Sequence, residues 1–241
     1  MIEPVVIGQH LVSPAHPPFI IAEMSGNHNG SLERAMAIVD MAAEAGAHAI
    51  KLQTYTADTM TIDVRHGEFL IEDPDSLWKG RNLYDLYREA HTPWEWHRPI
   101  FARAKELGIT AFSSAFDATA VDFLMSLDTP CFKVASFENT DIPLLKKVAA
   151  TGKPVIVSTG TASEEEIRTA VDTLKAAGAK QLMILKCTSA YPALPRESNL
   201  ATIPDMRKRF GVQVGLSDHT HGIGAAVAAV ALGACAIEKH V

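Results

Sequence analysis

Cysteine is scarce in this sequence of 241 residues, and the arrangement of its three cysteines excludes two classes of protein. No pair among Cys131, Cys187 and Cys235 has metal-ligand spacing, and all three lie in apolar, strand-like runs. We therefore expect reduced thiols in the core of a cytoplasmic protein, not a disulfide framework or a cysteine-rich metal site. The first residues do not show a charged region followed by an apolar one, so we expect no signal peptide.

Long hydrophobic runs and excess positive charge are also missing. The longest apolar stretch, residues 223–237, is interrupted by Gly224 and Gly233. It is shorter than the ~20 residues that span a bilayer, and it predicts a buried helix followed by a buried strand. The net charge of -6 at pH 7 argues against nucleic acid or an anionic membrane as a general partner.

A repeated pattern dominates the chain: a short apolar run, then an amphipathic helix, then glycine. Eight apolar runs read as buried parallel strands, beginning at Phe19, Ala49, Thr110, Cys131, Pro154, Leu182, Val212 and Cys235. Alternating strands and helices imply parallel pairing. We therefore predict an α/β fold, a (β/α)8 TIM barrel, for which ~250 residues are typical. A doubly wound sheet is the alternative, but the first turn, SGNHNG, lacks the G-x-G-x-x-G spacing of a dinucleotide site.

Boundary signals and two irregular segments complete the predicted domain. Ser163 with Glu166, and Thr92 with Pro93 and Glu95, predict capping boxes. Ser31, Asp117 and Asp141 are further predicted N-caps. Residues 55–91 form an insertion on the catalytic face, and residues 5–18 predict a hairpin under the barrel. We expect one TIM-barrel catalytic domain, residues 1–241, truncated after the eighth strand, in GACAIEKHV, so that the final helix is absent.

Four lysines at strand ends are the clearest chemical signal. Active sites of barrels lie at the C-terminal ends of the strands. An ammonium is almost never buried unpaired, so Lys51, Lys133, Lys186 and Lys239 predict a cationic mouth for a phosphate and a carboxylate. Serines and threonines at the strand ends would add neutral donors. The alternative, that some lysines point outward and pair with acids, is strongest for Lys186 and Lys239.

Histidines and acids at other strand ends suggest further roles. His219 and His240 end the neighbouring seventh and eighth predicted strands. Two imidazoles there can share a divalent cation with open positions for water and substrate, although a structural role for each is the alternative. Glu23 and Glu138 could orient a hydroxyl or transfer a proton, or could instead pair with a neighbouring lysine.

Several motifs together resemble the N-acetylneuraminate (sialic acid) synthase family. They are IIAEMSGNHNGSLERA, IKLQTYTADTMT, KVASFE, STG, ILKCTSAYP, GLSDHT and IEKH. The insertion, with LWKGRNLYDLYREAHTPWEWH, most resembles the pseudaminic acid synthases of that family. The resemblance covers nearly the whole chain.

The resemblance implies a metal-dependent condensation of phosphoenolpyruvate (PEP) with an open-chain amino sugar, which for pseudaminic acid synthases is 2,4-diacetamido-2,4,6-trideoxy-L-altrose. It implies PEP contacts at Lys51, Ser114, Lys133, Ser136, Ser158, Ser189 and Ser217. It implies sugar contacts at Glu23, Gln53, Phe116 and Tyr191, and Mn²⁺ or Mg²⁺ at His219 and His240. Ser189 stands where sialic acid synthases often have asparagine. We expect catalytic roles for Glu23, Lys133 and Glu138, with Glu138 transferring a proton.

Members of the family continue past the eighth strand with a sugar-binding aspartate, the final helix and an antifreeze-like domain. In their homodimer that domain caps the partner's barrel and donates an arginine. We therefore expect a homodimeric parent, and a truncated chain that is poorly active and leaves an apolar groove uncovered beside its eighth and first strands. A sialic or legionaminic acid synthase, a Schiff-base aldolase and a non-catalytic sugar-binding barrel are the alternatives.

Overall fold

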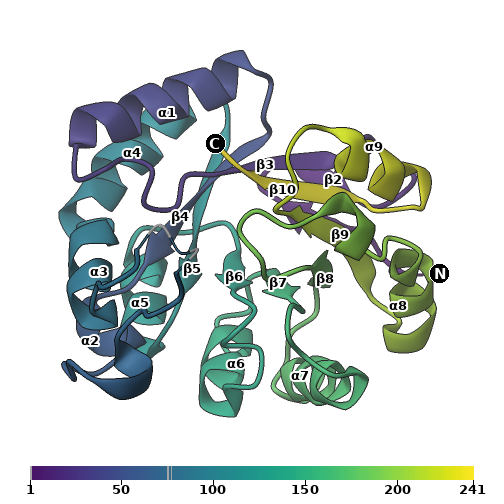
Figure 1. The fold of residues 1–241 in the computed structure, drawn as a ribbon. Helices are drawn as coiled ribbons and strands as arrows, with labels where there is room; N and C mark the ends of the chain where they lie inside the picture. Colours follow the sequence, from purple (N-terminus) through teal and green to yellow (C-terminus); the bar gives the residue numbers. More distant parts are fainter. Residues whose placement is uncertain (1, 75, 77) are drawn as a thin grey trace.

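The computed structural model describes residues 2–74, 76 and 78–241. In this part of the chain eight parallel strands close into a barrel (Figure 1), in the order β10-β3-β4-β5-β6-β7-β8-β9. They are β3 (Phe19–Glu23), β4 (Ala49–Thr54), β5 (Thr110–Ala115), β6 (Phe132–Val134), β7 (Val155–Ser158), β8 (Leu182–Cys187), β9 (Gln213–Asp218) and β10 (Ala236–His240). The barrel closes where β10 pairs with β3, with His240 beside Glu23. The predicted TIM barrel is confirmed, and the doubly wound alternative is wrong.

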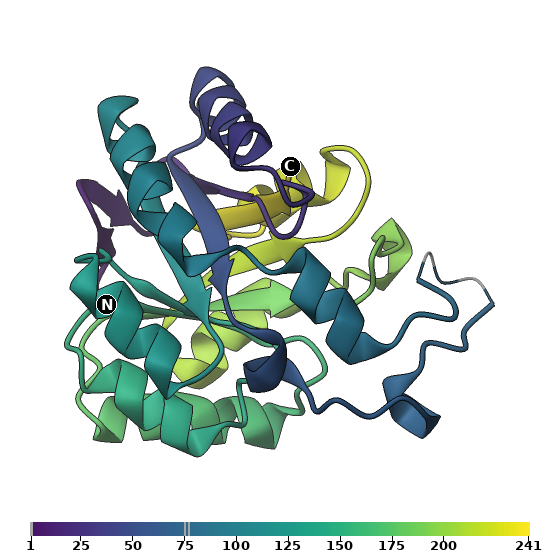
Figure 2. The same cartoon turned by 90° about the vertical axis from the view of Figure 1, so that its left-hand side faces the viewer.

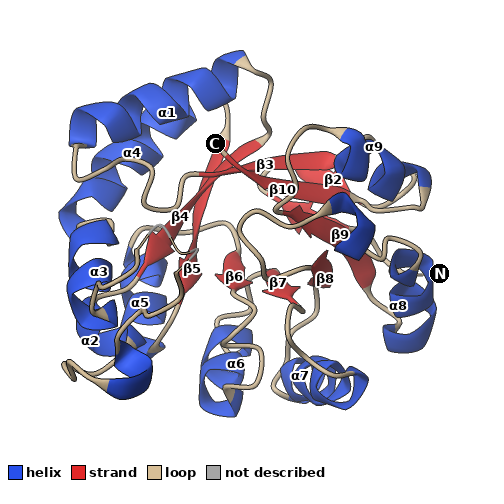
Figure 3. Ribbon diagram, in the orientation of Figure 1, coloured by secondary structure: helices blue, strands red, loops and turns tan. Residues whose placement is uncertain are grey.

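Helices cover the outside of the barrel (Figure 3). They are α1 (Leu32–Glu44), α4 (Trp94–Glu106), α5 (Ala118–Ser126), α6 (Ile142–Ala149), α7 (Glu164–Ala176), α8 (Thr202–Phe210), which follows a 3-10 turn (Pro195–Glu197), and α9 (Gly224–Ala231). The predicted N-caps of α1, α5, α6 and α7 each accept a backbone hydrogen bond from their own first turn. The capping box predicted at Thr92 is wrong. Pro93 is the N-cap of α4, and the buried Thr92 hydroxyl lies 3.1 Å from His28 Nε2 instead.

The insertion after β4 starts at the C-terminal end of the barrel. It contains α2 (Ala57–Met60), a 3-10 turn (Gly67–Phe69) and α3 (Leu83–Ala90). Figure 2 shows this blue segment reaching away from the barrel as an arm. Tyr87 of α3 packs edge-on against Tyr55, with ring centroids 5.9 Å apart. The arm is therefore anchored next to the tip of β4.

Side chains alternate along each strand between the inside of the barrel and the surrounding helices. Ile21, Phe112, Ile156 and Leu185 belong to one interior cluster. The hairpin β1 (Val5–Ile7) and β2 (His10–Val12) adds Val5, Ile7 and Val12 to this cluster. The predicted hairpin is confirmed, and it closes the N-terminal end of the barrel. The hairpin does not cover the C-terminal end of the barrel, where a binding site can form.

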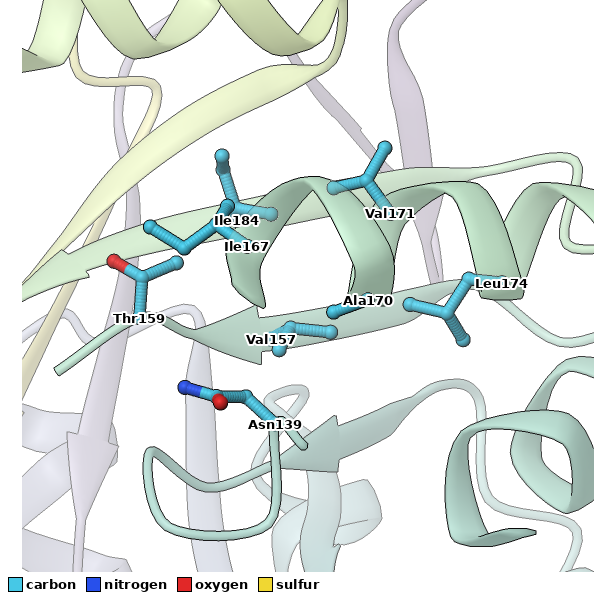
Figure 4. Close-up of a pocket in the computed structure, with 8 residues that line it drawn as sticks. All are labelled: Asn139, Val157, Thr159, Ile167, Ala170, Val171, Leu174 and Ile184. Carbon is cyan, nitrogen blue, oxygen red and sulfur yellow. The ribbon is translucent and has the colours of Figure 1, made fainter. Parts of the chain in front are cut away.

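In the outer layer α7 packs on strands β7 and β8 along an apolar seam that has no room for a water molecule (Figure 4). It is lined by Asn139, Val157, Thr159, Ile167, Ala170, Val171, Leu174 and Ile184. No charged side chain lines it, and the amide of Asn139 donates to the Ser158 carbonyl at 3.3 Å. We interpret this seam as ordinary packing of the helix layer, because it has no internal space and lacks the converging polar groups of a binding site.

Residues 223–237 form a helix and a strand, as predicted, but only the strand is buried. Ile223 is 74% and Val227 is 62% exposed. Within α9, Ala225 and Ala229 are the buried side chains. The expectation of a buried helix is therefore wrong: α9 is apolar on every side, and Ala225 and Ala229 face the barrel while Ala228 and Ala231 are exposed. Among the described residues no helix is long and apolar enough to cross a membrane.

Candidate active site

The interior of the barrel changes from apolar to polar toward its C-terminal end. Each of the eight strands contributes one side chain of this polar layer: Glu23, Lys51, Ser114, Lys133, Ser158, Cys187, Ser217 and Glu238. They line a cavity together with Gln53, Ala135, Ser136, Tyr191, His219 and His240. In strand β3, Ile21 occupies the apolar interior and Glu23 occupies the polar layer two residues later. Because side chains two residues apart on a strand point to the same face, each strand places an apolar residue in the barrel interior and a polar residue in the site above it.

Most of the predicted site residues meet in this cavity, and three lie outside its lining. Ser189 Oγ is 3.8 Å from the cavity-lining Cys187 Sγ, so it lies directly beside the site. Phe116 packs edge-on against Tyr55, with ring centroids 5.4 Å apart. Glu138 lies in the loop after β6. The roles expected for these three residues stay predictions.

The sequence reasoning did not expect Cys187 or Ala135 in the cavity, and it gave no role to Glu238, which stands at the end of the eighth predicted strand. A signal for two of them was available. Glu238 precedes His240 by two residues, and residues two apart on a strand share a face. The same spacing relates Cys187 to Ser189. Burial by itself raises the pKa of Cys187, but hydrogen bonds from His219 and Ser136 lower it overall to about 7.

Lys51 is held between two buried carboxylates. Its Nζ lies 2.5 Å from Glu23 Oε2 and 3.7 Å from Glu238 Oε2, and it donates to Ser114 Oγ at 3.1 Å. The pairing of Glu23 with a lysine, one of the alternatives, is thus observed. This pairing also corrects the expectation that the C-terminal end of the barrel carries a net positive charge from its lysines, because Glu23 and Glu238 already balance the charge of Lys51.

Neighbouring amides and hydroxyls hold the two carboxylates in place. Gln53 Nε2 donates to Glu23 Oε1 at 3.0 Å, and Ser217 Oγ donates to Glu238 Oε1 at 2.9 Å. Burial disfavours ionisation of Glu238, but Lys133 and Lys51 outweigh it and lower its pKa to about 2. Burial raises the pKa of Glu23 despite the attraction of Lys51. The site therefore keeps Glu238 ionised and makes Glu23 the more basic acid.

Lys133 has a different environment. It is 2% exposed, and its Nζ donates to Ser158 Oγ at 2.6 Å and to the Val134 carbonyl at 3.1 Å. Within the described ranges it makes no ion pair with a carboxylate. Burial lowers the pKa of Lys133. Because an ammonium has three donors, one N–H remains for a ligand in the cavity. A buried cation in this state favours an anionic ligand.

Lys186 and Lys239 do not line the cavity, which agrees with the alternative stated for them. Lys239 Nζ lies 2.8 Å from Asp218 Oδ2 and donates to the Thr220 carbonyl at 2.6 Å. Lys186 Nζ donates to Thr188 Oγ1 at 2.6 Å. Their neighbours along the strands take the inward positions, so alternation directs both lysines outward.

His219 and His240 lie side by side, with ring centroids 5.2 Å apart. His219 Nδ1 donates to the Thr188 carbonyl at 2.8 Å. Burial by itself would lower the pKa of His219, but its hydrogen bond with Cys187 outweighs burial and raises it, so a metal ion at Nε2 would have to displace a proton. The Tyr191 ring lies against His219 at a centroid distance of 4.1 Å. Burial, assisted by Lys51, lowers the pKa of His240 to about 4, so this imidazole is neutral at pH 7. Neutral imidazoles are the form that binds metals.

The histidine pair fits a divalent cation with few protein ligands. In residues 2–74, 76 and 78–241 no group of three or more histidine, cysteine or acidic side chains has the arrangement of a metal site. An ion at His219 and His240 would therefore take its remaining ligands from water or substrate, as open catalytic sites do. The residues present fit such an ion.

Glu138 combines burial with an unpaired oxygen. Its Oε2 is buried and has no hydrogen-bond partner among the described residues. Burial raises the pKa of Glu138 to about 7. A carboxyl group that titrates near neutrality can both accept and release a proton at physiological pH.

Comparisons with known proteins agree with the motifs. Residues 38–241 match the NeuB family. The chain belongs to this family. The pseudaminic acid synthase of Campylobacter jejuni subsp. jejuni serotype O:23/36 (strain 81-176) is 47% identical over 222 residues, which cover 92% of this chain and 64% of that protein. The pseudaminic acid synthase of Helicobacter pylori (strain ATCC 700392 / 26695) is 42% identical over 224 residues, covering 93% and 65%. The resemblance inferred from the motifs is confirmed.

One further relative and one solved structure show lower identity. The N,N'-diacetyllegionaminic acid synthase of Legionella pneumophila subsp. pneumophila (strain Philadelphia 1) is 38% identical over 227 residues, covering 92% of this chain and 63% of that protein. The crystal structure of N-acetylneuraminic acid (sialic acid) synthetase from Leptospira borgpetersenii serovar Hardjo-bovis in complex with citrate has a TM-score of 0.87 at 32% identity, covering 100% and 78%. The chain spans 64% of the length of the Campylobacter relative.

Proposed function

We propose that this chain forms the catalytic barrel of a pseudaminic acid synthase. The reaction would join PEP to open-chain 2,4-diacetamido-2,4,6-trideoxy-L-altrose, with water, to give a nonulosonic acid and phosphate. The observation that carries the proposal is Lys133, a buried ammonium without a carboxylate partner among the described residues, in a cavity lined by hydroxyls. The choice of sugar is supported by identity, which is 47% to a pseudaminic acid synthase and 38% to a legionaminic acid synthase.

PEP carries a phosphate and a carboxylate, and the cavity offers two lysines for them. Lys133, with Ser136, Ser158 and Ser189 around it, would bind the phosphate. Lys51, with Ser114 and Ser217 beside it, would bind the carboxylate in competition with Glu23 and Glu238, which already balance its charge. Hydroxyl and ammonium donors in a water-poor cavity stabilise anionic oxygens far better than they do in bulk water.

The sugar would lie on the open side of the cavity. Glu23 and Gln53, joined by a 3.0 Å hydrogen bond, and Tyr191 would contact its hydroxyl groups. His219 and His240 would hold Mn²⁺ or Mg²⁺. When bound, such an ion supplies Lewis-acid polarisation of an aldehyde oxygen.

The chemistry requires one C–C bond to form and one C–O bond to break. C3 of PEP attacks the aldehyde carbon, and positive charge develops at C2. Glu238, ionised because its pKa is about 2, would stabilise this charge. Water adds to C2, and the phosphate then leaves with its bridging oxygen. Glu138, whose pKa is about 7, would accept and return the proton.

Phosphate release from PEP, measured with the full-length parent and each candidate sugar, tests the proposal. Release that depends on the altrose derivative supports it. Preference for an N-acetylmannosamine or legionaminic precursor would identify another synthase. Trapping of pyruvate on a lysine by borohydride, without inhibition by a chelator, would indicate a Schiff-base aldolase. The homodimer and the cytoplasmic location stay predictions.

A further inference from the structure

Gly160 lies at the tip of β7, where side chains from two other segments occupy the space beside its Cα. It is buried, and its N–H donates to Ser136 Oγ at 3.1 Å. A Cβ at this position would overlap with Ser189 Oγ, and would lie 2.7 Å from Ser136 Oγ and 3.2 Å from Cys187 Sγ. Hydroxyl and thiol groups of the site therefore fill the volume that any other residue would need for its side chain.

Backbone conformation does not require glycine here. The φ angle of Gly160 is outside the positive range, so other residues could adopt this backbone without strain. No backbone atom is among the three nearest neighbours of the added Cβ. The requirement for glycine is thus set by the positions of the two hydroxyls and the thiol.

We propose that Gly160 is a positioning residue that sets the Ser136 and Ser189 hydroxyls at the phosphate end of the PEP site. This inference rests on the proposed function. Ser136 lies three residues after Lys133, and its hydroxyl accepts from Gly160 N–H at the tip of β7, where Ser158 Oγ accepts from Lys133 Nζ at 2.6 Å. Three hydroxyls and one ammonium at a single place form a donor set suited to phosphate oxygens.

A methyl group at position 160 should displace the hydroxyls without unfolding the barrel. Hydrogen bonds weaken steeply when the donor turns away, so a rotated serine loses its bond to phosphate. We expect Gly160→Ala to weaken PEP binding by about tenfold or more, as for loss of a hydrogen bond to a charged group.

Titration calorimetry with PEP, inorganic phosphate and pyruvate separates positioning from general damage. Gly160→Ala should weaken PEP and phosphate alike and change pyruvate affinity by less than about twofold. Gly224→Ala is the matched control, because its φ is also outside the positive range and its added Cβ would meet nothing within 4 Å. This control should bind all three probes like the wild type.

A double-mutant cycle tests whether Gly160 acts through Ser189. In the Ser189→Ala background, Gly160→Ala should cost less PEP affinity than it does alone, because the overlapping Ser189 hydroxyl is gone and the 2.7 Å approach to Ser136 Oγ is the part of the clash that remains. The inference would be overturned if the losses of PEP affinity from the two substitutions simply multiplied in the double variant. It would also be overturned if Gly160→Ala alone kept wild-type PEP affinity, lost as much affinity for pyruvate as for PEP, or failed to fold. A wild-type protein that binds neither PEP nor phosphate would overturn the proposed function itself.

Discussion

Replacing Lys51 with methionine should destabilise the protein in a pH-dependent way. The substitution leaves Glu23 and Glu238 buried, after removal of an ammonium that lay 2.5 Å and 3.7 Å from them. Removing one partner of a buried ion pair costs about 3–5 kcal/mol. A domain is stable by only about 5–15 kcal/mol, so the loss is a large part of the free energy of unfolding.

The pH dependence follows from the two carboxylates. Without Lys51, burial and mutual repulsion raise the pKa of Glu23 further in the folded state. A carboxyl group with a raised pKa favours the fold below its unfolded pKa and loses that contribution as pH rises through the folded pKa. The deficit of Lys51→Met relative to the wild type should therefore be larger at pH 8 than at pH 5.5.

Urea unfolding followed by the fluorescence of the three tryptophans measures this deficit at both pH values. Lys153→Met is the matched control, since Lys153 pairs at 2.8 Å with the exposed Asp128. An exposed ion pair contributes about 0–1 kcal/mol, so the control should barely change. A Lys51→Met deficit below about 1 kcal/mol at pH 8, or one that does not shrink at pH 5.5, would refute the reasoning.

Three further predictions concern other buried groups. Lys133→Ala should lower PEP affinity about a hundredfold or more in calorimetry, because it removes a buried cation that pairs with no carboxylate among the described residues; unchanged affinity would contradict the assignment. His240→Ala should abolish tight Mn²⁺ binding measured by electron paramagnetic resonance, and retained binding would place the ion elsewhere. Burial lowers the pKa of His97 to about 4, so between pH 6.5 and 4 protonation of the unfolded chain should cost up to about 3 kcal/mol of stability. Urea unfolding of His97→Gln should lose less over this interval, and an identical loss would exclude His97 as the source.

Much of the fold could be predicted because its signals are local. The apolar runs that became the eight strands, the N-caps such as Ser31 and Asp141, and the N-terminal hairpin all depend on neighbouring residues. The capping box at Thr92 failed because a distant partner, His28, takes the Thr92 hydroxyl. The prediction that α9 is buried failed because the sequence of a helix that is apolar on all sides does not indicate which face packs against the barrel.

The sequence by itself determined that polar groups would gather at one end of a barrel, since every strand ends in them. Only the tertiary structure decided which of them share the cavity. Strand alternation directs Lys51 and Lys133 inward and Lys186 and Lys239 outward, and barrel closure brings Glu238 within 3.7 Å of Lys51. The alternation itself is local, but which of its two faces points inward, and which strands become neighbours, depend on contacts between residues far apart in the chain.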